Sequence, residues 1–179
     1  MTAEQVIIAA IRIAGSLPVL RWPFWGALLA IAVDFSDLLW MNVLDLGGLG
    51  DYQTFDKWAD LAYMGAFLVV ALRWNGLVRQ VALGLFVFRM VGFTTFEFTQ
   101  ARALLLAFPN VFEFWFVFVA ARDQFRPAYV ITARRAAFWL VALTVAKLAQ
   151  EYALHGGKWF DKYTFFEFWS VLWHNLTPW

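Results

Sequence analysis

Cysteine is absent from this chain of 179 residues, and charged residues are scarce, at 15%. The lack of cysteine excludes disulfides, thiolate-ligated haem and a zinc ribbon, and it leaves carboxylates, two histidines and backbone oxygens as metal ligands. A soluble domain carries about 25% charged residues, so an ordinary soluble domain is excluded. The sequence has no basic face with interleaved aromatic residues, so it does not indicate nucleic-acid binding. A positive N-terminal region with an A-x-A site is also lacking, so we expect the first apolar segment to be retained.

What the sequence does contain is apolar, with 63% hydrophobic residues, 20 Phe and 11 Trp. A helix that spans a bilayer needs about 20 mostly apolar residues. The first apolar segment, residues 4–20, contains Arg12 and Pro18, and it either spans or lies in the interface as an amphipathic helix. The later segments are expected at residues 23–41, 55–74, 77–98, 102–121 and 134–154, with a shorter one at 164–179.

The short connections between these segments predict a single all-α domain. We expect a polytopic integral membrane helical bundle of about six transmembrane helices over residues 1–179, with residues 1–20 as the interfacial or spanning helix and 21–179 as the bundle. The expected location is a prokaryotic inner membrane, with membrane lipids as partners and a homodimer or a larger membrane complex as open alternatives. Tryptophans near segment ends are typical of the headgroup region, and they are Trp22, Trp25, Trp40, Trp58, Trp74, Trp159 and Trp179.

Ionisable residues inside the expected spans are the first functional candidates, because each costs at least about 2.5 kcal/mol at the bilayer centre unless it is paired or hydrated. Besides three aspartates, they are Arg89, Glu97, Glu113, Lys147, Glu151 and Glu167. Lys147 and Glu151 are four residues apart, and Arg89 and Glu97 are eight apart, so each pair shares a helix face. These residues either form structural ion pairs or line a polar path through the bundle.

Aspartates are concentrated in DFSDLLWMNVLDLGGLGDYQTFDKWAD, residues 34–60. Asp34 and Asp37 lie near the end of one expected helix, and Asp56 and Asp60 lie at the start of the next, with spacings that put each pair on one face. A short loop joins the helices, so the faces can meet. Four close carboxylates require a cation to stay ionised, and oxygen ligands suit Mg²⁺, Mn²⁺ or Ca²⁺. Alternatively, Asp56 caps its helix, while Asp45 and Asp51 are solvated loop residues.

The aspartate pattern resembles the signature of the CDP-alcohol phosphatidyltransferases, D-x2-D-G-x2-A-R-x8-G-x3-D-x3-D. Asp34, Asp37, Asp56 and Asp60 match its aspartates, with one extra residue in the loop, and the upstream AAIRIAGSLPVL resembles the family's T-x-x-R-I/V…P segment through Arg12. The resemblance covers about residues 8–70. It implies that the four aspartates hold divalent metal, Mg²⁺ or Mn²⁺, and that Asp60 is the catalytic base that deprotonates a lipid or lipid-linked alcohol.

The chain departs from the signature at three positions. Leu38 stands in place of Gly, and Met41 and Asn42 stand in place of Ala-Arg. Small residues are used where a ligand approaches the backbone, so Leu38 and Met41 narrow the space for a nucleotide.

Orientation is predicted by counting basic residues on the two sides of the expected bundle. The side opposite the aspartate loop holds seven, against four on the aspartate side, so the positive-inside rule favours the former as cytoplasmic. The seven are Arg21, Arg73, Arg79, Arg122, Arg126, Arg134 and Arg135, and the four are Lys57, Arg102, Lys158 and Lys162.

Three functions remain open from the sequence. The first is a metal-dependent phosphotransferase of the CDP-alcohol type. The second is a proton or cation carrier or channel that uses the intramembrane glutamates with Arg89 and Lys147. The third is a non-catalytic subunit of a larger membrane complex, in which the many Phe and Trp side chains supply contact surface.

Overall fold

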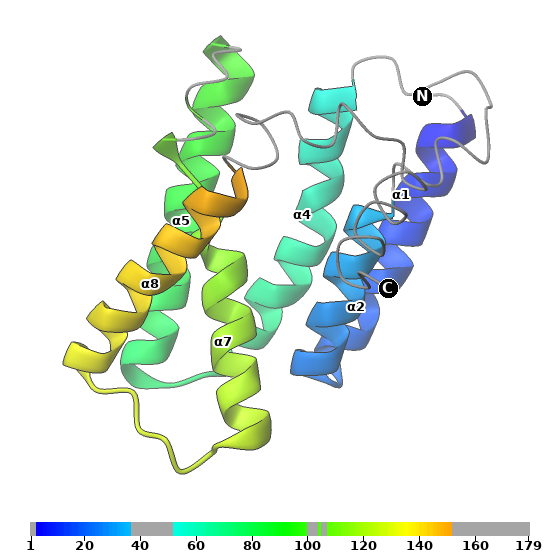
Figure 1. Ribbon diagram of the computed structural model, residues 1–179. Helices are drawn as coiled ribbons and strands as arrows, with labels where there is room; N and C mark the ends of the chain where they lie inside the picture. The colour runs from blue at the N-terminus through cyan, green and yellow to red at the C-terminus, as the bar shows by residue number, and fades with distance from the viewer. Residues whose placement is uncertain (1–2, 37–51, 100–103, 105–106, 152–179) are drawn as a thin grey trace, which may run out of the picture.

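A computed structural model describes residues 3–36, 52–99, 104 and 107–151, and every regular element in these ranges is helical (Figure 1). The expected all-α class is therefore confirmed. The elements are α1 (Ala3–Ser16), the 3-10 helix η1 (Leu17–Leu20), α2 (Pro23–Phe35), α4 (Tyr52–Ala71), α5 (Gly76–Thr99), α7 (Val111–Phe125) and α8 (Ala133–Glu151).

Proline and glycine define several of the helix boundaries. Pro18 lies in the first turn of η1 and Pro23 begins α2, positions where the missing N–H of proline costs no helical hydrogen bond. Gly76 has a φ of 60° at the start of α5. Only glycine adopts this conformation without strain, so it allows the chain to reverse direction between α4 and α5.

The expected segment boundaries broadly agree with the structure except around residue 110. The sequence predicts one helix over 102–121, whereas the chain is not helical at residues 108–110 and α7 runs from Val111 to Phe125. The reason is Pro109, which cannot donate a helical hydrogen bond and disfavours helical geometry in the residue before it. The expected segment 164–179 and the end of 23–41 lie outside the described residues.

Among the described helices, only Gly76–Thr99 is both long and apolar enough to cross a membrane. Three other apolar stretches, Gln5–Leu20, Pro23–Phe35 and Trp58–Ala71, are shorter. The number of membrane spans stays a prediction.

The core lies between α4 and α7. Phe67 and Phe116 are fully buried and stack with ring centroids 4.0 Å apart, and Trp115 donates from Nε1 to the carbonyl of Val78 on α5 at 3.3 Å. Trp74 stacks on Phe116 at 5.2 Å, so it packs against this core.

Three other tryptophans expected near segment ends are more exposed than Trp74. Trp22, Trp25 and Trp58 are exposed, and their location at a membrane interface stays a prediction. Trp40, Trp159 and Trp179 lie outside the described residues.

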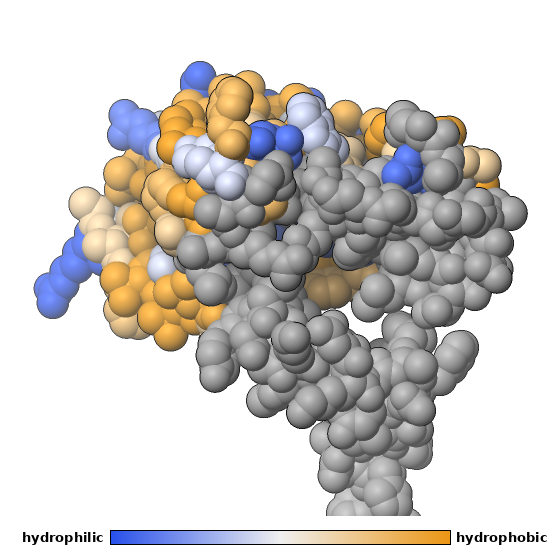
Figure 2. All heavy atoms as spheres, turned by 90° about the horizontal axis from the view of Figure 1, so that it is seen from above, coloured by the Kyte–Doolittle hydropathy of each residue, from blue (hydrophilic) through white to orange (hydrophobic). Residues whose placement is uncertain are grey.

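Three chain reversals lie at one end of the bundle, the lower end in Figure 1: η1 to α2, α4 to α5, and α7 to α8. The seven arginines counted above fall at or beside these reversals, and we call this the arginine end. Arg73 Nη1 donates to the carbonyl of Leu20 at 3.0 Å and ties two of the reversals together. Figure 2 looks onto the opposite end and shows apolar residues over much of the surface that the described residues form.

Candidate functional site in the bundle interior

Arg12 brings two of the predicted aspartates to one point. Its Nη1 lies 2.8 Å from Asp34 Oδ1 and 3.0 Å from Asp60 Oδ1, and its side chain is only 4% exposed. The three residues come from α1, α2 and α4, and Ser16 donates to the carbonyl of Arg12 at 2.7 Å one turn later. The sequence placed Arg12 beside the motif but did not predict that it pairs with the aspartates.

The predicted metal set is only partly within the described residues. Asp37 lies outside them, and so does the side chain of Asp56, although its backbone belongs to α4. In the described ranges, no group of three His, Cys, Asp or Glu residues could hold a metal ion. Within those ranges the Arg12 guanidinium supplies the positive charge between Asp34 and Asp60, and the four-aspartate metal site stays a prediction.

A second polar group surrounds Glu113 in the first turn of α7. Its Oε2 lies 3.6 Å from Lys147 Nζ on α8, and the side chains of Glu113 and Lys147 are 8% and 7% exposed. Tyr63 donates to the same oxygen at 3.3 Å, and Asn110 Nδ2 does so at 3.2 Å. Asn110 also donates to the Tyr63 hydroxyl at 2.9 Å. Glu113 therefore accepts hydrogen bonds from two neutral donors and forms an ion pair with Lys147, which compensates for its burial.

Lys147 also contacts residues other than Glu113. Its Nζ donates to Gln150 Oε1 at 2.8 Å and lies 5.2 Å from the centre of the Phe114 ring. The sequence spacing suggested Glu151 as its partner, but the Glu151 side chain lies outside the described residues. The contact with Glu113 on another helix was not predicted.

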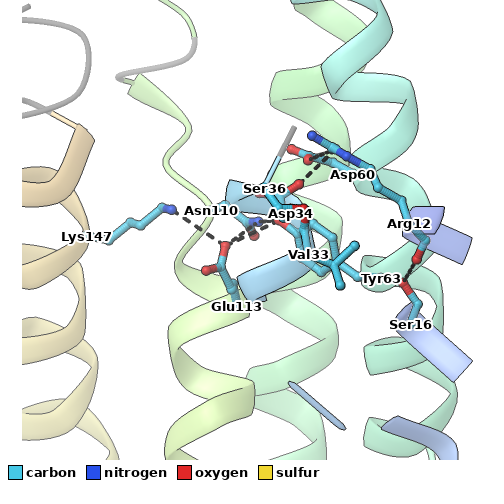
Figure 3. Close-up of polar contacts among 10 residues, drawn as sticks. All are labelled: Arg12, Ser16, Val33, Asp34, Ser36, Asp60, Tyr63, Asn110, Glu113 and Lys147. Atoms are coloured by element: carbon cyan, nitrogen blue, oxygen red, sulfur yellow. Dashed lines mark hydrogen bonds and ion pairs between the residues drawn. The ribbon is translucent and has the colours of Figure 1, made fainter. Parts of the chain in front are cut away.

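Tyr63 belongs to the Glu113 group and lies one helical turn from Asp60. It follows Asp60 by three residues on α4, which places both side chains on one face of the helix, and its hydroxyl reaches Glu113. A polar layer thus crosses the bundle through α1, α2, α4, α7 and α8 (Figure 3). We define this layer as Arg12, Asp34, Asp60, Tyr63, Asn110, Glu113 and Lys147.

The remaining predicted residues are not joined to this layer by the described contacts. Arg89 Nη1 donates to the carbonyl of Phe108 at 3.0 Å and does not pair with Glu97 within the described residues, so that predicted pair is not formed. Both residues lie on α5. Glu167 lies outside the described ranges.

Tyr63 and Asn110 were missed because they carry no charge. The sequence does contain a signal for both, since Tyr63 lies three residues after one candidate acid and Asn110 three residues before another. A neutral hydrogen-bond donor is expected three or four residues from a carboxylate that becomes buried.

A cavity of about 290 Å³ opens beside the Glu113 end of the layer, between α2, α7 and α8. Its lining is largely apolar, with Ile31, Val117 and Leu143 among the walls, and Glu113 and Gln150 are its polar members. A small ligand or water in this cavity would be next to the carboxylate that Lys147 pairs with.

These features define an all-helical bundle with a buried charged layer. No protein-family model, no curated protein and no solved structure matches the chain.

Proposed function

We propose that the protein is a multi-pass membrane carrier that binds a proton or a small cation in the polar layer. The observation that carries the proposal is the presence of two charged groups inside one bundle: Arg12 with Asp34 and Asp60, and the buried pair of Glu113 and Lys147. Tyr63, one helical turn after Asp60, donates to Glu113. Charged groups buried in a membrane bundle are costly, and they commonly mark ion or proton pathways.

Exposed apolar side chains support the membrane location. On α8, Phe138, Val141 and Val145 repeat at helical spacing and are 66%, 66% and 61% exposed. On α5, Val87 and Val91 lie one turn apart and are 58% and 48% exposed. Contiguous apolar surface of this kind is unfavourable in water and suits contact with lipid.

The depth of the layer supports the same conclusion. Asp60 and Lys147 belong to the layer, and Arg73 and Arg135 belong to the arginine end on the same two stretches of chain. At a rise of about 1.5 Å per helical residue, the chain from Asp60 to Arg73, and from Arg135 to Lys147, spans roughly 18–20 Å. A hydrocarbon core is about 30 Å thick, so a boundary at the arginine end places the layer within it.

The chemistry of the layer suits exchange of a cation. Asp34 and Asp60 share one guanidinium, so an incoming cation or proton competes with Arg12 for two carboxylates at once. The Tyr63 hydroxyl accepts from Asn110 and donates to Glu113. It therefore holds a hydroxyl proton against the Glu113 carboxylate, one helical turn after Asp60 on α4.

Flux into proteoliposomes tests the proposal. A pH-sensitive dye and a sodium-sensitive dye trapped inside report entry of protons and Na⁺ when a potassium diffusion potential is imposed. We expect flux above that of empty liposomes, and a loss of at least about tenfold in Asp60→Asn and in Glu113→Gln. The matched control is Asp123→Asn, because Asp123 is about half exposed, at 47%, beside the arginine end.

The carrier proposal fails if the wild-type protein gives no flux of either ion above the empty vesicles. It fails equally if Asp123→Asn reduces the flux as much as the substitutions in the layer.

A second candidate is a divalent-metal-dependent phosphotransferase of the CDP-alcohol phosphatidyltransferase type. One observation favours it: Asp34 and Asp60, the first and last aspartates of the motif, lie against the same atom of Arg12. In this proposal Asp37 and Asp56 complete the ligand set for Mg²⁺ or Mn²⁺, and Asp60 removes the proton of the acceptor alcohol.

Metal titration distinguishes the two candidates. A ligand at one hundred times its Kd stabilises the folded state by about 2.7 kcal/mol. The thermal midpoint of the wild-type protein should therefore rise by several degrees with Mg²⁺ or Mn²⁺, and that of Asp37→Asn/Asp60→Asn should not. An unchanged wild-type midpoint with each metal up to millimolar concentration removes the phosphotransferase candidate.

A further inference from the structure

A second cavity lies at the arginine end, and no residue of the polar layer is among its lining residues. It has a volume of about 380 Å³ and is formed by the end of α7, the connection to α8, and the first turns of α8. Its walls are mainly aromatic, and two arginines belong to its lining: the main members are Phe118, Phe125, Tyr129, Trp139, Arg122 and Arg126.

The aromatic walls are held in place by specific contacts. Trp139 Nε1 donates to the Tyr129 hydroxyl at 3.2 Å, and the Arg135 guanidinium lies 4.7 Å above the Tyr129 ring. Phe118 packs against Trp139 with centroids 4.6 Å apart. An apolar chain that enters therefore meets preformed walls, which lowers the ordering cost of binding.

The positive charge in the lining belongs to Arg122 and Arg126. Arg122 is 17% exposed, and its Nε lies 2.8 Å from the carboxylate of Asp123. Arg126 is exposed and forms no ion pair within the described ranges. The guanidinium of such an exposed arginine can bind a phosphate through two parallel N–H donors.

The surroundings favour an anionic ligand over a neutral one. The cavity lies among the seven arginines of the arginine end, and basic residues near a membrane surface attract anionic headgroups by about 1 kcal/mol each. Phe125 itself is 57% exposed and lies edge-on to Phe24 at 4.9 Å, so the apolar surface extends from the cavity onto α2.

We propose that this cavity binds an anionic phospholipid, with its phosphate held by Arg126 and Arg122 and part of one acyl chain against the rings of Phe118, Phe125 and Trp139. The proposal rests on the membrane location in the proposed function but not on the transport of any ion. It assigns a role to a site that shares no charged residue with the polar layer.

Native mass spectrometry of the intact protein in dodecyl maltoside tests the site. Phosphatidylglycerol and phosphatidylcholine with identical chains are titrated separately, and a third arm uses glycerol phosphate without chains. We expect phosphatidylglycerol to bind more tightly than phosphatidylcholine, and glycerol phosphate not to bind. Arg122→Gln/Arg126→Gln should weaken phosphatidylglycerol binding by at least about fivefold, the equivalent of about 1 kcal/mol.

The matched control is Arg21→Gln/Arg79→Gln, which removes the same charge from the same end without touching the cavity lining. It should leave binding within about twofold of the wild type. The proposal is overturned if this control loses as much affinity as the cavity variant, because a general surface charge would then explain the binding. Equal affinity for the two lipids, or binding of glycerol phosphate as tight as that of phosphatidylglycerol, overturns it as well.

One further variant separates this proposal from the proposed function. Glu113→Gln lies in the polar layer and should retain lipid binding while losing flux. Loss of lipid preference with normal flux would refute the lipid site alone, and normal lipid binding without wild-type flux would refute the carrier alone.

Discussion

The contact between Glu113 and Lys147 permits a double-mutant cycle with a calculable result. The two side chains are 8% and 7% exposed, and their charged atoms are 3.6 Å apart. Lys147→Met keeps a similar volume and removes the charge. It leaves the Glu113 carboxylate buried without its described cation, and breaking such a pair costs about 3–5 kcal/mol.

Two remaining hydrogen bonds reduce that cost. Tyr63 and Asn110 continue to donate to Glu113 Oε2 at 3.3 and 3.2 Å, each contributing about 1 kcal/mol. We therefore expect Lys147→Met to lower the free energy of unfolding by about 3 kcal/mol. The double variant Glu113→Gln/Lys147→Met contains no uncompensated charge at this pair, so it should lose less, about 1–2 kcal/mol.

The measurement is reversible unfolding in mixed micelles of dodecyl maltoside and dodecyl sulfate, for both single variants, the double variant and the wild type. Lys147→Arg is the control, because it keeps the charge. A coupling energy below about 0.5 kcal/mol would refute the reasoning, since contacting residues in one network are expected to couple by more than that.

Two further predictions concern packing and hydrogen bonding. Tyr63→Phe removes the donor to Glu113 and should destabilise the protein by about 1–3 kcal/mol in the same unfolding assay, because both partners are buried; an unchanged stability would show that this link is not formed. Gly92→Ala places a Cβ in steric conflict with the Phe108 side chain, so it should cost about 1–3 kcal/mol. Its matched control on the same helix is Gly84→Ala, where an added Cβ meets nothing in the described part of the chain within 4 Å beyond the helix's own backbone, and this variant should gain up to about 1 kcal/mol from helix propensity. Equal effects of the two alanine substitutions would contradict the close contact between α5 and Phe108.

The helical architecture could be predicted from the sequence because it depends on local properties. Apolar runs of the right length, interrupted by glycine, proline and charge, predicted α5 almost to the residue. The start of α7 was misplaced because hydrophobicity alone was followed through FPN, residues 108–110, although Pro109 ends helical geometry there.

The site was only partly predictable. Spacing along each helix suggested that Asp34 and Asp60 could approach each other, because consecutive helices joined by a short loop pack together, and both carboxylates do lie against Arg12. Their partner Arg12 comes from α1, outside the two helices that the spacing argument considered. No local rule links Glu113 to Lys147, which lies on a different helix, so the spacing argument could only offer Glu151 as a partner within α8.

The ion pairs of the layer also hold α1 and α8 in place, so binding of an ion to their carboxylates would affect the packing of these helices. Arg12 ties α1 to α2 and α4, and Lys147 ties α8 to α7, so each ion pair holds an outer helix to the centre of the bundle. A cation or proton that neutralises Asp34 and Asp60 removes the attraction that holds Arg12, and it thereby weakens the attachment of α1. A ligand shifts a conformational equilibrium only through its different affinity for the two states. In the proposed carrier, competition between the ion and the Arg12 guanidinium for Asp34 and Asp60 would provide that difference.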